Sequence, residues 1–146
     1  MPSTLIDPIG AALQGKVAAL TVQGQAAKGY WPAPASLDKV PAGVVEPPEA
    51  SRRDIDASES ALGSNDWLLT FPVTLYVLLD EAESAQDAAV DFVEAFIKAV
   101  DADQGLGVAG VIEARVVSSE PVVIEDQARA LYSYECRCEV LAEHVY

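Results

Sequence analysis

The chain has 146 residues, 51% of them hydrophobic, so it suits one domain that buries about 70% of its unfolded surface and excludes wholesale disorder. Its 23 acidic and 9 basic residues give a formal net charge of -14, which disfavours nucleic-acid binding because phosphate contacts need clustered Lys and Arg. The sequence has neither the apolar run of about 18 residues expected of a membrane span nor the start of a signal peptide.

The first predicted element is a helix over residues 7–20. Asp7 supplies a capping carboxylate, and Pro8 has the backbone angle preferred at the first helical position. An apolar stripe at helical spacing follows, and Gln14 and Lys16 lie outside it. The stripe consists of Ile6, Ile9, Ala12, Leu13, Val17 and Leu20. We expect this helix to dock on the rest of the domain.

The composition changes over residues 24–66, which hold five of the nine prolines. A connection of this length without periodicity is uncommon in a compact domain, so we interpret it as a functional arm or a disordered segment. We therefore expect removal of residues 36–62 to leave the domain folded.

Two pairs of residues in this arm are candidates for interaction. Tyr30 and Trp31 either fold back onto the core or anchor a neighbouring subunit, since aromatic residues dominate interface hot spots. Arg52 and Arg53 form a basic pair that Asp54 and Asp56 follow closely. We interpret this pair as part of a solvated loop or as a polar contact with a partner.

A strand and a helix follow the arm. Residues 67–79 begin with Trp67 and alternate in their second half, which predicts a strand. Pro72 has no backbone N–H to donate, so we expect it at a sheet edge or a bulge. The helix is predicted to begin with Ser84 as its cap and to continue to Asp101.

The remaining residues predict three strands joined by short polar turns. Gly105 is expected to be a left-handed helix cap, and strands are expected over residues 112–117, 122–124 and 132–140. The run Gly105-Leu-Gly-Val-Ala-Gly110 matches a dinucleotide-binding pattern. It follows a helix and precedes a strand, which inverts the geometry that a pyrophosphate site needs, so we interpret it as a turn.

No pattern in the sequence indicates catalysis, a cofactor or a metal. Cys136 and Cys138 are two apart in the last strand, so we expect two buried thiols on one face. His144 is the only histidine, too little for a tetrahedral metal site. We expect a non-enzyme with an α+β fold: one domain over residues 1–146, with a mixed or antiparallel sheet of about four to five strands packed with two helices.

The order of features over the whole chain carries a family resemblance. An N-terminal helix, the Tyr30-Trp31-Pro32 segment and a long loop precede the strand led by Trp67. A helix rich in Ala, Val and Phe, the Leu106-Gly107 turn and the closing Tyr132-Ser-Tyr134-Glu135 strand follow. This order resembles the tail terminator proteins of long-tailed bacteriophages, a family of small α+β minor tail proteins. One departure is Val108-Ala109, which separates glycines that the family pattern places together.

The resemblance implies a ring, usually a hexamer, that caps the tail tube, stops its polymerisation and meets the head–tail connector. Its partners are then other copies of the chain, the tube protein and the connector. DNA passes through the lumen without specific binding, which the acidic charge favours by repulsion. The implied location is the virion, after assembly in the host cytoplasm. The candidate interaction residues are Tyr30, Trp31, Arg52, Arg53, Trp67 and Pro72.

Three other functions remain open at this point. A neck or head-closure protein of the same virion would also be small and ring-forming. An acidic DNA mimic that inhibits a nuclease would spread carboxylates over an extended surface and act as a monomer or dimer. A small enzyme of another type is the third alternative.

Overall fold

The computed structural model describes residues 3–35, 37, 39–52, 66–78, 82–125 and 130–143. These residues form two helices and a mixed sheet, which confirms the predicted α+β class. In chain order the elements are α1 (Ser3–Ala18), β1 (Thr21–Val22), β2 (Gln25–Ala26), β3 (Lys28–Tyr30), β4 (Ala42–Val45), β5 (Glu49–Arg52), β6 (Asp66–Leu78), α3 (Ala82–Asp101), β7 (Val111–Glu125) and β8 (Ala130–Glu143).

The main sheet has six strands in the order β3-β4-β6-β8-β7, with β5 beside β6. Strands β3 and β4 pair in parallel, and every other pairing of the sheet is antiparallel. Strands β1 and β2 form a separate two-stranded hairpin. The central strand β6 therefore has β8 on one side and β4 followed by β5 on the other.

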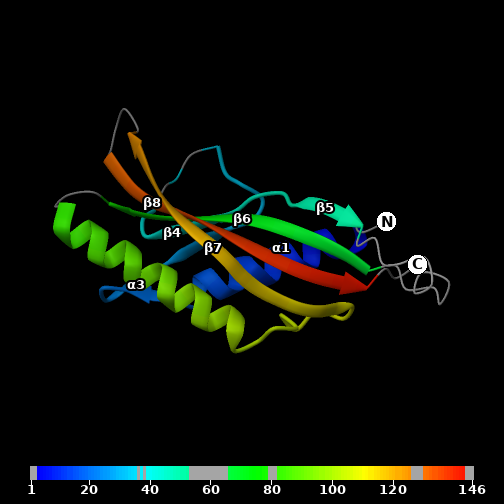
Figure 1. Ribbon diagram of the computed structural model, residues 1–146. Coiled ribbons are helices and arrows are strands. Elements are labelled where there is room, and N and C mark those ends of the chain that lie inside the picture. The colour runs from blue at the N-terminus through cyan, green and yellow to red at the C-terminus, as the bar shows by residue number, and fades with distance from the viewer. Residues whose placement is uncertain are drawn as a thin grey trace.

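Both helices pack on the same face of this sheet (Figure 1). Helix α3 contacts β6, β7 and β8, whereas α1 contacts β3 and β4. The alternation predicted for β6 is present, because its odd-numbered residues from Leu69 to Val77 are buried in one hydrophobic core with both helices. The largest fully buried side chains include Phe71, Phe92, Phe96, Ile9 and Leu13.

The arm predicted over residues 24–66 is wrong for its first part. Residues 25–52 contribute strands β2 to β5, each two to four residues long, and residues 53–65 lie outside the described ranges. Strand β4 shows no alternation because all four of its residues are buried. Strands of two to four residues are too short to leave a periodic signal in the sequence.

Glycines allow α1 to approach these short strands closely. A methyl group on Gly43 would lie 2.6 Å from Cγ1 of Val17, and one on Gly29 would overlap the carbonyl oxygen of Gln14. The Gln14 side-chain amide donates a hydrogen bond of 3.1 Å to the Gly29 carbonyl. The glycines of β3 and β4 thus serve helix–sheet contact.

Several predicted boundaries change. Helix α1 begins at Ser3 and contains Pro8, and α3 begins at Ala82, before the predicted cap Ser84. The chain after α3 turns with positive φ at Leu106 and Gly107, 55° and 67°, so Gly105 is not the left-handed residue. These shifts fall at helix ends, where residue preferences are weak guides.

The two strands predicted over residues 112–117 and 122–124 form one continuous strand, β7. Its residues pair with β8 throughout, with register shifts between Val111 and Glu113 and between Val116 and Ser118. The intervening Pro121 is compatible with pairing because β7 is the last strand of the sheet, so one side of it needs no N–H donor.

Candidate functional site

Trp31 is a core contact. Its ring lies edge-on to Phe71, with 6.1 Å between ring centroids, and it covers Gly10 of α1, where a methyl group would overlap the indole. The sequence left two roles open for this residue, folding back onto the core or anchoring a neighbouring subunit. The structure shows Trp31 folded back onto the core, where it fixes the chain after β3 to α1 and the sheet. The small Gly10 surface is what admits the large ring.

Tyr30 occupies the opposite face of the sheet. It pairs with Val44 of β4, and the Lys28 ammonium lies 5.1 Å from the centre of its ring, within cation–π range. The Tyr30 side chain is half-buried. The Trp31 side chain is also half-buried, but it packs against the hydrophobic core.

Pro72 is not at a sheet edge. It lies in the central strand, opposite Arg137 of β8, at the point where the neighbour on the other side changes from β4 to β5. The Pro72 carbonyl accepts a 2.9 Å hydrogen bond from the Glu46 N–H. The Pro72 nitrogen faces the same side of β6. Residues 46–48, between β4 and β5, are not paired with β6 there, so the N–H that proline lacks is not needed for strand pairing.

Trp67 and Arg52 are neighbours at the start of β6. Arg52 of β5 pairs with Trp67, which pairs on its other side with Ala142 of β8. The Trp67 side chain packs partly against the hydrophobic core. Arg53 lies outside the described residues. The predicted interaction residues are therefore dispersed over the sheet, and the structure does not gather them into one site.

The two cysteines are buried thiols, as predicted. Cys136 and Cys138 face the helices, and both side chains are inaccessible to solvent. Burial raises the pKa of each thiol to about 12; Glu135 adds to the effect on Cys136, and Cys136 and Glu139 add to the effect on Cys138. The thiolate that nucleophilic chemistry needs is therefore scarce at neutral pH.

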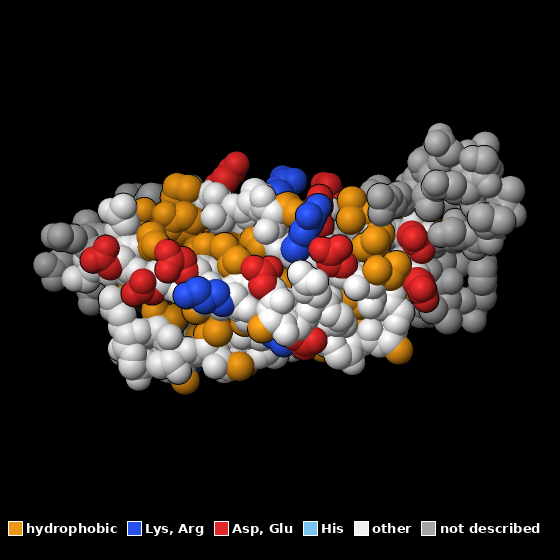
Figure 2. Space-filling view, turned by 60° about the horizontal axis from the view of Figure 1, so that its bottom comes forward, with side chains coloured by type: hydrophobic (Ala, Val, Ile, Leu, Met, Phe, Trp, Pro, Cys, Tyr) orange, Lys and Arg blue, Asp and Glu red, His pale blue; other side chains and the backbone are white. Residues whose placement is uncertain are grey.

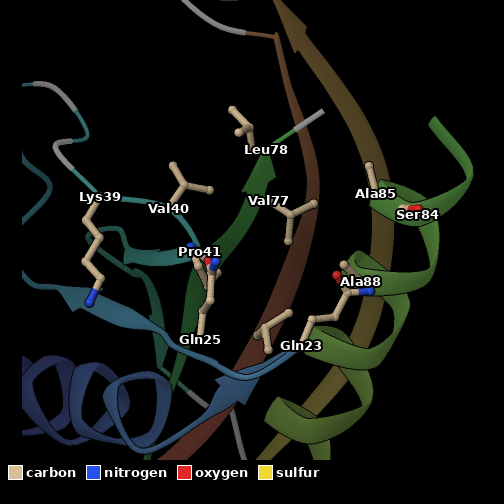
Figure 3. Close-up of a pocket in the computed structure, with 11 residues that line it drawn as sticks. Gln23, Gln25, Lys39, Val40, Pro41, Val77, Leu78, Ser84, Ala85 and Ala88 are labelled. Atoms are coloured by element: carbon tan, nitrogen blue, oxygen red, sulfur yellow. The ribbon is translucent and has the colours of Figure 1, made fainter. Parts of the chain in front are cut away.

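A cavity of about 430 Å³ opens between the β1–β2 hairpin, the end of β6 and the start of α3 (Figure 3). Val22, Val77 and Ala88 contribute apolar surface, while Gln25 and Lys39 contribute polar groups. Within the described ranges no group of three or more His, Cys, Asp or Glu side chains is placed to hold a metal ion.

The exposed face of α3 is strongly acidic. It carries Asp87, Asp91, Glu94 and Asp101, with Lys98 as its basic residue. Figure 2 shows acidic side chains spread over this side of the molecule, with hydrophobic side chains visible between them. The four carboxylates outnumber the single cation, so this face repels a polyanion.

The sheet face away from the helices mixes both charge signs, and β7 forms its border (Figure 1). Arg115 of β7 lies opposite Glu139 of β8, whereas Glu120 lies opposite Glu135. Each of these side chains except Glu135 and Glu139, which are half-buried, is exposed. The sheet therefore contains one attractive and one repulsive charge pair across the same two strands.

Strand β7 also exposes large hydrophobic side chains. Ile112, Val117 and Val122 have 45%, 43% and 37% of their surface exposed. Because the sequence predicted two short strands here, it did not predict one long strand at the border of the sheet. The signal that identifies it is the pair of β-branched runs, Val116-Val117 and Val122-Val-Ile124, separated by only four residues.

None of the described helices is long and apolar enough to cross a membrane. No protein-family model and no curated protein matches this chain.

Proposed function

We propose that this chain is a tail terminator of a long-tailed bacteriophage. In this proposal its copies form a ring, most simply a hexamer, that caps the tail tube, stops its elongation and joins it to the head–tail connector. The observation that carries the proposal is the order of elements along the whole chain. Helix α1, the Tyr30-Trp31-Pro32 segment, β6, α3, the Leu106-Gly107 turn and β8 follow one another as in the family that the sequence resembles.

The charge distribution supports the same proposal. The face of α3 presents Asp87, Asp91 and Glu94 to solvent, in a chain of net charge -14. In the proposed ring this face lines the passage, because a surface with an excess of negative charge lets DNA slide without adhering. The sheet face is a poorer lining, since Arg115 and Arg137 would attract phosphates.

Deletion of the gene tests the role in the particle. Loss of a terminator leaves tube polymerisation unchecked, so we expect overlong tails and heads without tails in electron micrographs. Loss of a neck or head-closure protein instead leaves free tails of normal length. Particles of normal form and infectivity would contradict both roles.

The purified protein tests the ring directly. Light scattering and negative-stain imaging should show closed rings, either in solution or on isolated tail tubes from the deletion strain. Adding the protein to those tubes should stop their growth. A chain that remains monomeric in solution and leaves tube growth unchanged would overturn the proposal.

A further inference from the structure

Strand β7 ends the sheet with a long free border. It has 15 residues and pairs only with β8 in the described part of the chain. Three of the five most exposed large hydrophobic side chains, Ile112, Val117 and Val122, belong to it. A long edge strand with exposed apolar side chains is a template for pairing with another strand. We propose that β7 pairs antiparallel with β7 of a second copy of this chain, about a two-fold axis.

Strand length favours β7 itself as the partner. The strands at the other border of the sheet are β3 and β5, with 3 and 4 residues. Neither can satisfy more than a fraction of the N–H and C=O groups along β7. A second β7 matches this length, although pairing is interrupted at Pro121, which has no N–H to donate. The two-fold axis gives each copy the same contacts.

Charge selects the alignment of the two strands. Glu120 lies opposite Glu135 in the same chain, an unfavourable like-charge pair, whereas Arg115 lies opposite Glu139. Pairing that sets Arg115 against Glu120 of the second copy creates a row across four strands: Glu139, Arg115, then Glu120 and Glu135 of the second copy. Arg115 then lies between two carboxylates. The axis repeats this row, so both Glu120 side chains gain a cation.

The irregularity in β7 makes this alignment geometrically consistent. Arg115 and Glu120 are five positions apart, which in a regular strand places them on opposite faces. The register shift between Val116 and Ser118 returns both to the face that Glu135 and Glu139 share. The same alignment sets Val117 opposite Ser118 of the second copy, so the two exposed valines meet near the axis. A shift by two residues would instead oppose Glu113 to Glu120.

A two-fold contact closes at two copies, so it does not build the proposed ring and does not depend on it. The contact leaves the outer face of α3 and the β3–β5 border exposed, so these surfaces can still take part in other contacts. The pairing can therefore be tested from the mass and the contacts of the dimer alone.

The test reverses the two charges singly and then mixes the variants. Arg115→Glu and Glu120→Arg each create like-charge pairs at both symmetry-related positions, so each should dissociate at least about tenfold more readily, as measured by sedimentation equilibrium. An equimolar mixture of the two should recover the wild-type affinity, because every pair across the axis is then opposite in sign. Lys98→Glu and Glu94→Arg make the same net-charge changes on α3 and should leave the association unchanged.

A cysteine cross-link gives a second measurement that does not depend on charge. Ser118→Cys places an exposed thiol beside the axis, so mild oxidation should yield a covalent dimer, while the buried native thiols stay unreactive. A wild-type chain that is monomeric up to about 1 mM would overturn the proposal. So would a mixture that fails to recover affinity, or a Ser118→Cys variant that forms no dimer. A partner strand from another protein would appear as β7-dependent association without this recovery.

Discussion

The indole of Trp31 lies against the α-carbon of Gly10, so the segment after β3 is held by the first helix. Gly10 is buried and helical, and a methyl group there would overlap three carbon atoms of the indole. Glycine is required at this position by packing, and not by an unusual backbone angle. The same contact places Trp31 edge-on to Phe71 in the centre of the sheet.

Gly10→Ala should lower the free energy of unfolding by about 1–3 kcal/mol, because the added methyl displaces the indole from a packed core. Gly15 of the same helix is the matched control, since it is exposed and a methyl group there meets nothing within 4 Å. Gly15→Ala should raise the free energy of unfolding by up to about 1 kcal/mol through helix propensity. Urea unfolding measures both; equal effects of the two substitutions would contradict the Trp31 contact.

The buried thiols predict alkaline destabilisation. Their pKa is about 12 in the folded chain against 9.0 when unperturbed. Below pH 9 both states keep the protons and stability is constant; above pH 9 the unfolded chain loses them first. The free energy of unfolding should therefore fall towards pH 12, by at most about 1.4 kcal/mol per pH unit for each thiol.

Replacing Cys136 and Cys138 by serine should remove this part of the pH dependence while lowering stability by a few kcal/mol at most. A thiol reagent at pH 8 should not react with the native wild type and should titrate two thiols after unfolding. Rapid reaction in the native state would show that the thiols are accessible.

An ion pair ties α1 to the turn after α3. The Lys16 ammonium lies 2.9 Å from a carboxylate oxygen of Asp103, and the two side chains are 24% and 46% exposed. Because solvent screens the pair, Asp103→Asn should lower the free energy of unfolding by no more than about 1 kcal/mol. The coupling from a double-mutant cycle with Lys16→Met should shrink further in 1 M salt. A coupling independent of salt would contradict this interpretation.

Removing residues 36–62 should unfold the domain, contrary to the expectation from composition. The deletion eliminates β4 and β5, and with them the buried side chains of Val44 and Val45 beside β6. Circular dichroism and thermal unfolding of the deletion variant measure the outcome. A shorter deletion of residues 54–64, which spares every described strand, is the control. A cooperative transition in the longer deletion would restore the interpretation of a dispensable arm.

Charge on α3 should matter for DNA passage if the proposed ring forms. Asp87→Lys with Asp91→Lys should slow DNA ejection from assembled particles, because cations in the lumen bind phosphates. Asp7→Lys on the exposed side of α1 is a control of the same type at a different surface. Equal ejection rates for wild type and the α3 variant would exclude this face as the lining.

The sequence predicted the elements that are long and half-buried. The alternation of β6, the apolar stripe of α3 and the alternation of β8 each extend over enough residues to fix the element and its buried face. Strands β3 to β5 were not predicted, because they are three or four residues long and depend on α1 and β6 for their burial. The single strand β7 over residues 111–125 was not predicted, because Ser118-Ser-Glu-Pro121 has the composition of a turn.

The candidate surfaces were less predictable than the fold. Whether Trp31 faces the core or a partner depends on Gly10, which is twenty-one positions away in sequence. The position of Pro72 depends on where β4 ends and β5 begins. The border at β7 exists only because β8 inserts between it and β6. These relationships arise from tertiary pairing, which local patterns do not encode.

The position of β8 determines when the sheet can be completed during folding. The strand lies inside the sheet, between β6 and β7, yet it is the last element of the described chain. During synthesis β6 must wait for β8 through the whole of α3 and β7, with the N–H and C=O groups of that edge unpaired. Such non-local pairing makes folding slow, in the range of milliseconds to seconds. A break in translation or a proteolytic cut before residue 130 leaves the middle of the sheet open, and the product is a target for chaperones and proteases.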